Sequence, residues 1–310
     1  MPRLTVLGSL NTDISVTVPR LPAPGETVLG SAAVIAPGGK GANQAVAAAR
    51  LGAAVRMIGC TGDDDFGRAA RAALAAEGVD ASGVRAVADG VTGLALITVD
   101  AAGENVITVA PGANGQVGAA EIAAALSAGG DLLVLSAEIP AGVLVTVLAG
   151  ARAAGLACLL NLAPAPAEPA GLLAGGVDWL VVNESEAAAV LGRAVNGLAG
   201  AGAAARALRA LGAGHAVVTA GSQGAALAGP GADEVIPAFR VDSVDSVGAG
   251  DAFAAALAVA LAAGVPAAGA VRAAAAAGAT ATIRRGTQDA LPRPAGILAA
   301  TGLTWPVPSD

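Results

Sequence analysis

The sequence has little charge and almost no aromatic side chains. Of its 310 residues, 13% are charged and 2% are aromatic, and tyrosine is absent. A net charge of −7 without a basic run, and so few rings to stack on bases, argues against nucleic acid as the main partner. Two cysteines and one histidine are too few for a disulfide framework or a Cys/His metal site. Because no signal peptide precedes the first strand-like run, we expect a protein of the reducing cytoplasm.

The hydrophobic content of 55% and the mean hydropathy of +0.68 raise the question of a membrane span. One long uncharged run, residues 252–271, has the length that a bilayer crossing needs. It consists mostly of alanine, however, and Gly264-Val265-Pro266 interrupts it. A membrane helix needs larger apolar side chains and interfacial aromatics. We therefore predict two alanine-rich helices, residues 252–263 and 267–282, in a soluble protein without a membrane partner.

Charged residues that stand alone in apolar stretches are the first functional candidates. Lys40 is the only lysine, and Glu138 and Asp251 each lie alone in a long uncharged stretch. Burying such a charge is costly without a partner, so a strongly perturbed environment is expected around each of them.

Short β-branched runs alternate with alanine-rich helical stretches. This pattern predicts an α/β fold, a three-layer α/β/α sandwich whose central sheet is mostly parallel and Rossmann-like. A chain of 310 residues is long enough for two domains or for one large core, and we expect a single domain over residues 1–310. The expected strands are residues 3–7, 55–60, 131–135, 157–160, 179–182 and 216–219. The expected earlier helices are residues 41–50, 65–77, 141–153, 184–191 and 203–211.

Two pairs of segments depart from this alternation. Residues 13–18 with 27–35, and residues 92–99 with 105–109, resemble half-exposed antiparallel strands separated by Pro/Gly turns. They are too short to form a domain. We predict a small β-sheet lid inserted at one edge of the sandwich, from about 12–37 and 91–110.

Two glycine clusters carry most of the predicted chemistry. Gly248-Ala249-Gly250-Asp251 opens a helix, where free N–H groups form an anion site and Asp251 would place a base beside bound phosphate. Alternatively, Asp251 only stabilises the helix dipole. In the second cluster, Gly38-Gly39-Lys40-Gly41-Ala42-Asn43, the donors of Lys40 and Asn43 suit a polyhydroxylated ligand, although a plain turn is the alternative. Neither cluster matches a P-loop or a dinucleotide fingerprint.

The order of the motifs resembles that of the ribokinase-like (PfkB) family of carbohydrate kinases. Residues 8–13 and 38–45 resemble the N-terminal signature of its ribose-type members, and residues 245–253 resemble the second signature. Further motifs occur in family order at residues 60–64, 103–105, 112–114, 183–186 and 219–224. The resemblance covers essentially the whole chain and implies one α/β kinase domain with ATP as the phosphoryl donor.

The resemblance implies that D-ribose is phosphorylated at its 5-hydroxyl, giving ribose 5-phosphate and ADP. Asp251 matches the catalytic base, and Gly248, Ala249 and Gly250 match the backbone anion hole. The positions that would hold the sugar are Asn11, Asp13, Gly38, Gly39, Lys40, Asn43, Glu138 and Asp251. Family kinases for 2-deoxyribose, fructose or a nucleoside remain alternatives, and a non-catalytic sugar- or nucleotide-binding regulator is a distant one.

The resemblance also implies sites for ATP, Mg²⁺ and K⁺. The nucleotide positions are Asn183, Thr219, Gly221, Ser222, Gly224 and Gly250. Glu186 would organise Mg²⁺ through water. The positions of the potassium site are Asp245, Val247, Ala281, Arg284 and Gly286. Ala290 stands where a serine commonly lies near the cation, and a homodimer through the lid is implied as well.

Several polar residues have simpler expectations. The acidic run 63–65 is expected to form a turn and a helix cap. Glu138 could merely cap backbone at a strand end, and Glu186 could belong to a solvated helix start. His215, Cys60 and Cys158 are expected to be structural.

Overall fold

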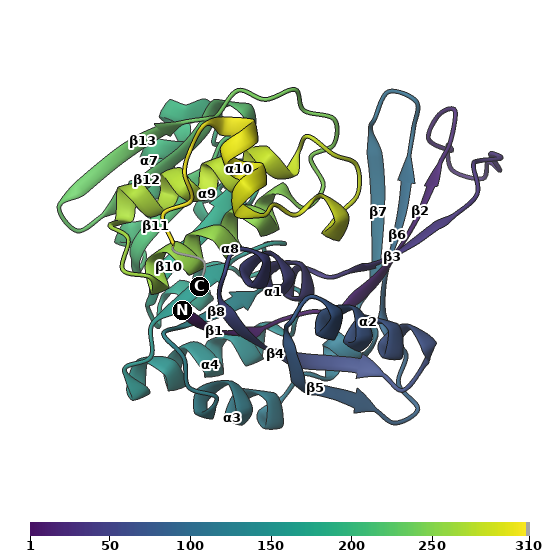
Figure 1. The fold of residues 1–310 in the computed structure, drawn as a ribbon, viewed down its shortest axis with the longest axis horizontal. Coiled ribbons are helices and arrows are strands. Elements are labelled where there is room, and N and C mark those ends of the chain that lie inside the picture. The colour runs from purple at the N-terminus through teal and green to yellow at the C-terminus, as the bar shows by residue number, and fades with distance from the viewer. Residues whose placement is uncertain (308–310) are drawn as a thin grey trace.

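The strands of the central sheet are runs of apolar residues. They are apolar because helices cover both faces of the sheet and bury the side chains on each. The computed structural model describes residues 1–307, and the sheet has nine strands (Figure 1). In spatial order they are β13 (Ala232–Pro237), β12 (Gly224–Gly229), β11 (Ala213–Thr219), β10 (Val177–Asn183), β9 (Cys158–Asn161), β8 (Leu132–Ser136), β1 (Arg3–Leu7), β4 (Ala54–Gly62) and β5 (Asp80–Val87). The strands from β5 to β11 are mutually parallel, and β12 and β13 are antiparallel additions.

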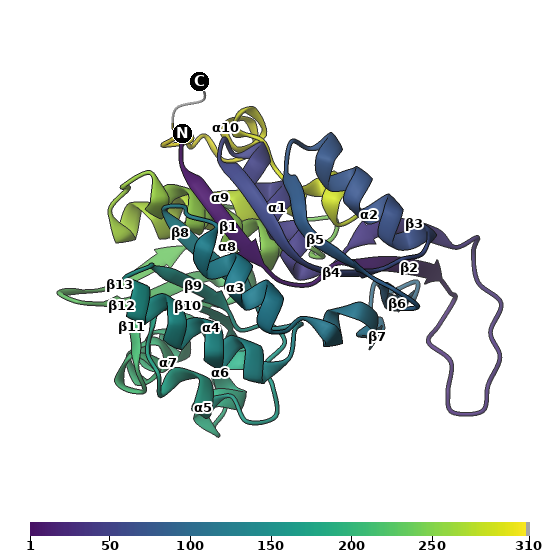
Figure 2. The same cartoon turned by 90° about the horizontal axis from the view of Figure 1, so that it is seen from below.

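Two helical layers enclose the sheet, as the edge-on view in Figure 2 shows. The first layer comprises α1 (Lys40–Arg50), α2 (Asp65–Ala76), α8 (Ala249–Ala262), α9 (Ala267–Ala281) and α10 (Pro294–Thr301). The second comprises α3 (Ala119–Ser127), α4 (Ala141–Ala154), α5 (Ala170–Leu173), α6 (Glu184–Leu191) and α7 (Gly197–Ala210). Strand residues alternate between the two cores: Val134 packs into the first and Leu135 into the second. The predicted three-layer sandwich is confirmed.

The alanine-rich run forms two helices, as predicted. α8 ends at Ala262 and α9 starts at Ala267, with Gly264 in the left-handed region at φ 78° between them. Within residues 1–307, none of the helices has the length and apolarity needed to cross a bilayer.

A second sheet of four strands projects from the edge of the sandwich, on the right of Figure 1. Its order is β3 (Val34–Gly38), β2 (Asn11–Thr17), β6 (Gly93–Val99) and β7 (Asn105–Ala110). We call this sheet the lid. Two details differ from prediction: β2 pairs with β6 in parallel, and residues 27–33 are not a strand. β3 instead continues to Gly38. It pairs with β2 from Asn11 opposite Gly38 to Ser15 opposite Val34.

Some elements carried no readable signal. The hairpin β12–β13 begins with the sequence GAALAG, whose alanines and glycines have low strand propensity. β5 contains Gly83 and a register irregularity in its pairing with β4. α7 starts at Gly197, earlier than predicted. This start was not predicted because the first two turns contain only small residues and one leucine, which show no apolar periodicity.

Candidate active site

The predicted site residues gather at the carboxyl edge of the parallel strands. β1 leads to Asn11, β8 to Glu138, and β10 and β11 end side by side at Asn183 and Thr219. Loops that follow the carboxyl ends of parallel strands meet at one edge of the sheet, where α/β proteins bind ligands.

Two helix N-termini meet at Asp251. Asn43, in the first turn of α1, donates from Nδ2 to Asp251 Oδ2 at 2.9 Å. Gln44 donates from Nε2 to Asp251 Oδ1 at 3.1 Å. Asp251 lies in the first turn of α8 and is 5% exposed, and Gly248 caps this helix in the left-handed region at φ 78°. Both carboxylate oxygens are therefore held by neutral donors, beside the backbone of Gly248, Ala249 and Gly250.

The glycines at the start of α1 bring this helix against residues 8–11, which follow β1. Gly39 has φ 91°, and a Cβ there would lie 2.6 Å from the backbone nitrogen of Asn11. A Cβ on Gly41 would lie 2.7 Å from the carbonyl carbon of Gly8. Larger residues at these two positions would push the helix away from the strand.

Glu138 caps this N-terminus. Its Oε2 accepts from the backbone N–H of Lys40 at 3.0 Å and from the Ser9 hydroxyl at 2.5 Å. The capping role considered for Glu138 is thus observed. Glu138 also faces the other charged groups of the site, since it shifts the pKa values of Asp13 and Lys40.

Asn11 and Asp13 belong to the first strand of the lid. Asn11 Oδ1 accepts from Asn114 Nδ2 at 2.7 Å, and Asn114 also bonds both backbone groups of Leu10. A Cβ at Gly38 would overlap the Asp13 carboxylate, so only glycine leaves that carboxylate its place. Asn114 belongs to the motif at residues 112–114, but no role was predicted for it. An uncharged carboxamide does not stand out in the sequence as an isolated charge does.

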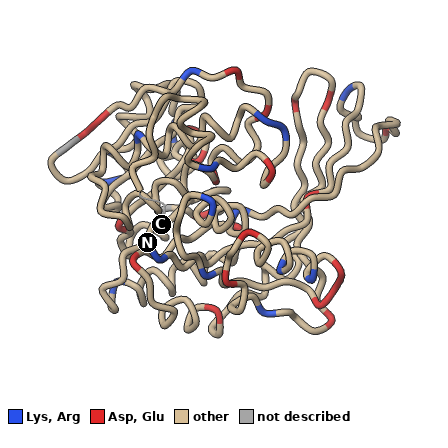
Figure 3. Tube along the Cα trace, in the orientation of Figure 1, with Lys and Arg blue, Asp and Glu red and all other residues tan. Residues whose placement is uncertain are grey.

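The charged groups here perturb one another, although charge is sparse along the rest of the trace (Figure 3). Burial, and after it the charges of Glu138 and Asp251, raise the pKa of Asp13 to about 6, against the lowering effects of the Thr287 hydroxyl and Lys40. The pKa of Lys40 is raised, first by Asp251 and also by Glu138, against the effect of burial. Lys40 is therefore a cation within a group of carboxylates.

Asn183 and Glu186 form a capping box at the start of α6. Asn183 Oδ1 accepts from the Glu186 N–H, and Glu186 Oε2 accepts from the Asn183 N–H, both at 2.8 Å. Burial raises the pKa of Glu186, and coulombic effects of Lys40 and Asp251 reach it. Glu186 thus faces the same site, and its Oε1 is not used in the capping box.

The segment after β11 turns sharply beside Asn183. Gly221, at φ 51°, starts the 3₁₀ turn η2 (Gly221–Gln223), in which Ser222 is exposed. Gly224, at φ 122°, leads into β12, and a Cβ there would overlap the carbonyl of Ile236. We call the segment that contains Thr219, Gly221, Ser222 and Gly224, at the carboxyl end of β11, the ledge.

Asp245 ties two loops together. Its Oδ1 accepts from Val247 N–H at 3.0 Å and its Oδ2 from Gly286 N–H at 3.1 Å. Ala281 is the last residue of α9, and Arg284 is exposed in the loop that follows. One carboxylate with nearby backbone carbonyls is a hard-oxygen donor set. Among the residues that the structure describes, no three Asp, Glu, His or Cys side chains cluster as a metal site.

Ala290 is buried at 4% exposure in the 3₁₀ turn η3 (Gln288–Ala290). With only a methyl group, it provides no side-chain oxygen toward the loops that Asp245 joins.

The residues with structural expectations behave as predicted. Asp64 caps α2, accepting from Gly67 N–H at 2.7 Å. His215 stacks on Trp179 with ring centroids 3.9 Å apart. Cys60 and Cys158 are buried, and burial raises each thiol pKa to about 12, so neither is a reactive thiolate.

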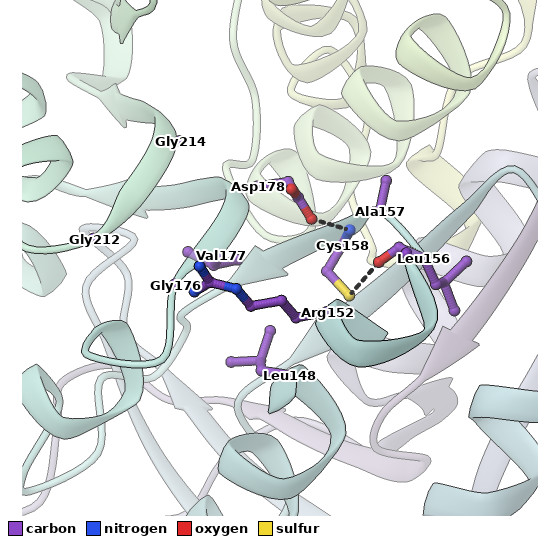
Figure 4. A pocket seen from close by; sticks show the side chains of 11 residues that line it. Leu148, Arg152, Leu156, Ala157, Cys158, Gly176, Val177, Asp178, Gly212 and Gly214 are labelled. Carbon is purple, nitrogen blue, oxygen red and sulfur yellow. Dashed lines mark hydrogen bonds between the residues drawn. The ribbon is translucent and has the colours of Figure 1, made fainter. Parts of the chain in front are cut away.

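A separate cavity of about 380 Å³ lies at the opposite edge of the sheet (Figure 4). It opens at the amino ends of β9 and β10, where Asp178 accepts from the Cys158 N–H at 2.8 Å. Arg152 donates to the carbonyl of Gly175 at 2.7 Å there. None of the predicted site residues lines this cavity.

Comparison with known proteins shows the family to which the chain belongs. The family model of the pfkB family carbohydrate kinases matches residues 1–294. The ribokinase of Haemophilus influenzae is 36% identical, with 93% of this chain and 95% of that protein covered. The deoxyribokinase of Salmonella typhi is 34% identical, with the same coverage of 93% and 95%. The structure of Arabidopsis thaliana ribokinase complexed with ribose and ATP has a TM-score of 0.84 and 31% identity, covering 96% of this chain and 98% of that one. The chain belongs to the pfkB family of carbohydrate kinases and is a sugar kinase.

Proposed function

We propose that this sugar kinase transfers the γ-phosphoryl group of ATP to the 5-hydroxyl of D-ribose, giving ribose 5-phosphate and ADP. The observation that carries the proposal is the position of Asp251, a buried carboxylate at the N-terminus of α8 that faces Asn43 and Lys40. The similarity to ribokinases over more than nine tenths of the chain supports the choice of sugar.

Asp251 acts as the general base in this proposal. Its carboxylate takes the proton from the 5-hydroxyl as that oxygen attacks the γ-phosphorus and the bond to ADP breaks. The N–H groups of Gly248, Ala249 and Gly250 stabilise the charge on the transferring group, at about 3 kcal/mol for each well-placed donor; that of Ala249 first has to leave the Ser246 carbonyl, to which it donates at 3.3 Å. Asp251 keeps its place during the transfer because Asn43 and Gln44 hold both of its oxygens.

The remaining sugar hydroxyls are bound by both the lid and the sandwich. Asn11, Asp13 and Gly38 provide the lid side, and Gly39, Lys40, Asn43 and Glu138 provide the sandwich side. A ring of carboxylates and amides suits a polyhydroxylated ligand, since each hydroxyl can donate to one group and accept from another. 2-Deoxyribose is the second candidate substrate, because the deoxyribokinase relative is nearly as similar as the ribokinase.

ATP lies along the ledge of Thr219, Gly221, Ser222 and Gly224, with Asn183 beside its phosphates in this proposal. Glu186 fits Mg²⁺ held through water, since Oε2 is occupied by the Asn183 N–H and one carboxylate oxygen is left to face the ion's hydration shell. Bound Mg²⁺ would neutralise phosphate charge. Glu186 would accept a hydrogen bond from metal-bound water through Oε1, and its Oε2 keeps the start of α6 in place.

Potassium fits the two loops joined by Asp245. The donor set would be Asp245 with backbone oxygens of Val247, Ala281, Arg284 and Gly286, all hard ligands suited to this cation. A cation there would fix the backbone just before Gly248 and offset phosphate charge. Ala290 leaves one contact of the family pattern unmade.

The exposed apolar side chains of the lid support a homodimer. Val34 on β3 is 61% exposed and Ile107 on β7 is 48% exposed, and both lie on one face of the lid because the register joins Val34 through Ser15 and Ile97 to Ile107. A strip of this kind on a monomer surface marks an interface. We expect sedimentation to give a dimer, and Ile107→Asp to give a monomer. A monomeric wild type at micromolar concentration would contradict the dimer.

The function is tested by coupled ADP release over a panel of pentoses, hexoses and nucleosides. We expect the highest kcat/KM on D-ribose with ATP. An equal or higher kcat/KM on 2-deoxyribose would overturn the ribose assignment in favour of the second candidate. Sugar binding without turnover on any member of the panel would instead indicate a non-catalytic regulator.

A further inference from the structure

Gln288 lies outside every motif that predicted the site, yet its side chain reaches the base through one intermediary. Its Nε2 donates to Asn43 Oδ1 at 3.1 Å, and Asn43 Nδ2 in turn donates to Asp251 Oδ2 at 2.9 Å. An amide oxygen only accepts and an amide nitrogen only donates. Gln288 therefore determines which end of the Asn43 amide faces Asp251.

The backbone around Gln288 is anchored independently of any ligand. Arg50 donates from one guanidinium nitrogen to the carbonyls of Gln288 at 2.5 Å and of Leu291 at 3.1 Å. Arg50 is itself paired with Glu77 at 2.6 Å, and its side chain is 11% exposed. A partly buried, bidentate ion pair of this kind holds the 3₁₀ turn η3 against α1.

The same short segment contacts the site at consecutive residues. Gly286 donates to Asp245, the Thr287 hydroxyl lowers the pKa of Asp13, and Gln288 donates to Asn43. No ion pair to Asp251 occurs within residues 1–307. The carboxylate thus depends on the carboxamides of Asn43 and Gln44 for its hydrogen bonds, and only Asn43 has its orientation set by another side chain.

We propose that Gln288 is a positioning residue that holds the Asn43 amide with its nitrogen toward Asp251. It keeps the base oriented toward the sugar hydroxyl without touching the sugar itself. The proposal rests on the proposed function for its kinetic consequence, whereas the orientation of Asn43 can be measured without turnover.

A double-mutant cycle tests this coupling. Gln288→Leu removes the donor at similar volume and should lower kcat/KM for the sugar roughly tenfold, the size expected for one buried hydrogen bond. The KM for ATP should stay within twofold. In the Asn43→Ala background, Gln288→Leu should have no further effect beyond twofold, because Gln288 acts only through Asn43. Additive losses, or an equal rise in the KM for ATP, would overturn the proposal.

Two further variants separate positioning from general damage. Gln288→Glu keeps the shape but turns an acceptor toward Asn43 Oδ1, so its loss should exceed that of Gln288→Leu. Gln116→Glu, at an exposed glutamine in the 3₁₀ turn η1 (Gly112–Gln116), is the matched control and should behave as wild type. A Gln288→Glu enzyme as active as wild type would contradict the proposal.

The side-chain amide signals of Asn43 provide a readout without substrate. They are assigned in ¹⁵N NMR spectra of the ligand-free protein by their loss in Asn43→Ala. In Gln288→Leu they should shift and exchange faster with solvent, and unchanged signals would overturn the positioning role. If wild type phosphorylates no sugar while Gln288→Leu still shifts these signals, the proposed function fails and the positioning of Asn43 stands.

Discussion

Asn43 Nδ2 lies 2.9 Å from Asp251 Oδ2, so one hydrogen bond joins the first turn of α1 to the first turn of α8. The positive ends of two helices therefore converge on one buried carboxylate. This arrangement favours negative charge at the point where a phosphoryl group and a base have to approach each other.

Asp251→Asn should abolish most of the turnover. The amide cannot accept the hydroxyl proton, so kcat should fall by about 10² to 10⁴, the usual contribution of a positioned general base. ATP binding, followed by calorimetry, should change little. Asp89→Asn, at an exposed loop aspartate, is the control and should keep full activity. A kcat of Asp251→Asn within tenfold of wild type would exclude Asp251 as the base.

Asp13→Asn should stabilise the free protein at alkaline pH while impairing sugar binding. The folded-state pKa of about 6 is above the ordinary value of 3.8, so the folded protein binds a proton more tightly than the unfolded chain does. The contribution of protonated Asp13 to the free energy of unfolding is fully present below pH 4 and is lost as the pH rises through 6. Because Asp13 is only half-buried, we expect a gain for Asp13→Asn of about 1–2 kcal/mol at pH 8 and almost none at pH 4.

This gain is measured by urea unfolding at both pH values, with Asp89→Asn as the comparison. An equal effect of Asp13→Asn at pH 4 and pH 8 would contradict the raised pKa of Asp13.

Lys40 should react slowly with amine reagents. Its pKa is raised, chiefly by Asp251, so little of the amine is neutral and nucleophilic at pH 8. Lys40 is the only lysine, and the exposed Met1 amine is the internal reference. Acetylation followed by mass spectrometry should show Lys40 modified at least about tenfold more slowly than Met1, and faster in Asp251→Asn. Equal rates at the two amines would contradict this.

Turnover should depend on the monovalent cation. Replacing K⁺ by Na⁺ or by a bulky organic cation should lower kcat several-fold, because the loop that holds Asp245 and Val247 directly precedes the proposed anion hole. Asp245→Asn should weaken the dependence on K⁺, since a neutral amide binds a hard cation less strongly than a carboxylate does. A kcat indifferent to the cation would refute a potassium site here.

The site was predictable from the sequence where its residues carry charge. Lys40, Glu138 and Asp251 each stood out in an uncharged stretch, and the fold brings all three to one edge of the sheet. In the structure, groups from a distant part of the chain compensate each of these isolated charges.

Three carboxamides that support the candidate site, directly or through another side chain, were not predictable. Gln44, Asn114 and Gln288 are uncharged and occur in ordinary turns and helix starts, so only their contacts reveal them. The capping contact between Glu138 and the backbone of Lys40 was likewise hidden, because it joins residues 98 positions apart. In the fold, sequence reasoning missed β5, β12 and β13, and β12 consists almost entirely of alanine and glycine, so its pairing depends on neighbouring strands rather than on its own propensity.

The bond between Asn43 and Asp251 spans 208 residues of sequence, which has a consequence for synthesis on the ribosome. The sugar-side segment around Lys40 leaves the exit tunnel early, whereas α8 and the turn at Gln288 emerge only near the end of translation. A chain forms contacts while it is still being synthesised. A nascent or prematurely terminated polypeptide therefore contains the residues proposed to bind the sugar but lacks Asp251, the proposed base. With Asp251 as the proposed base, we expect phosphoryl transfer to begin only after α8 has docked, and we expect fragments left by stalled translation to be inactive.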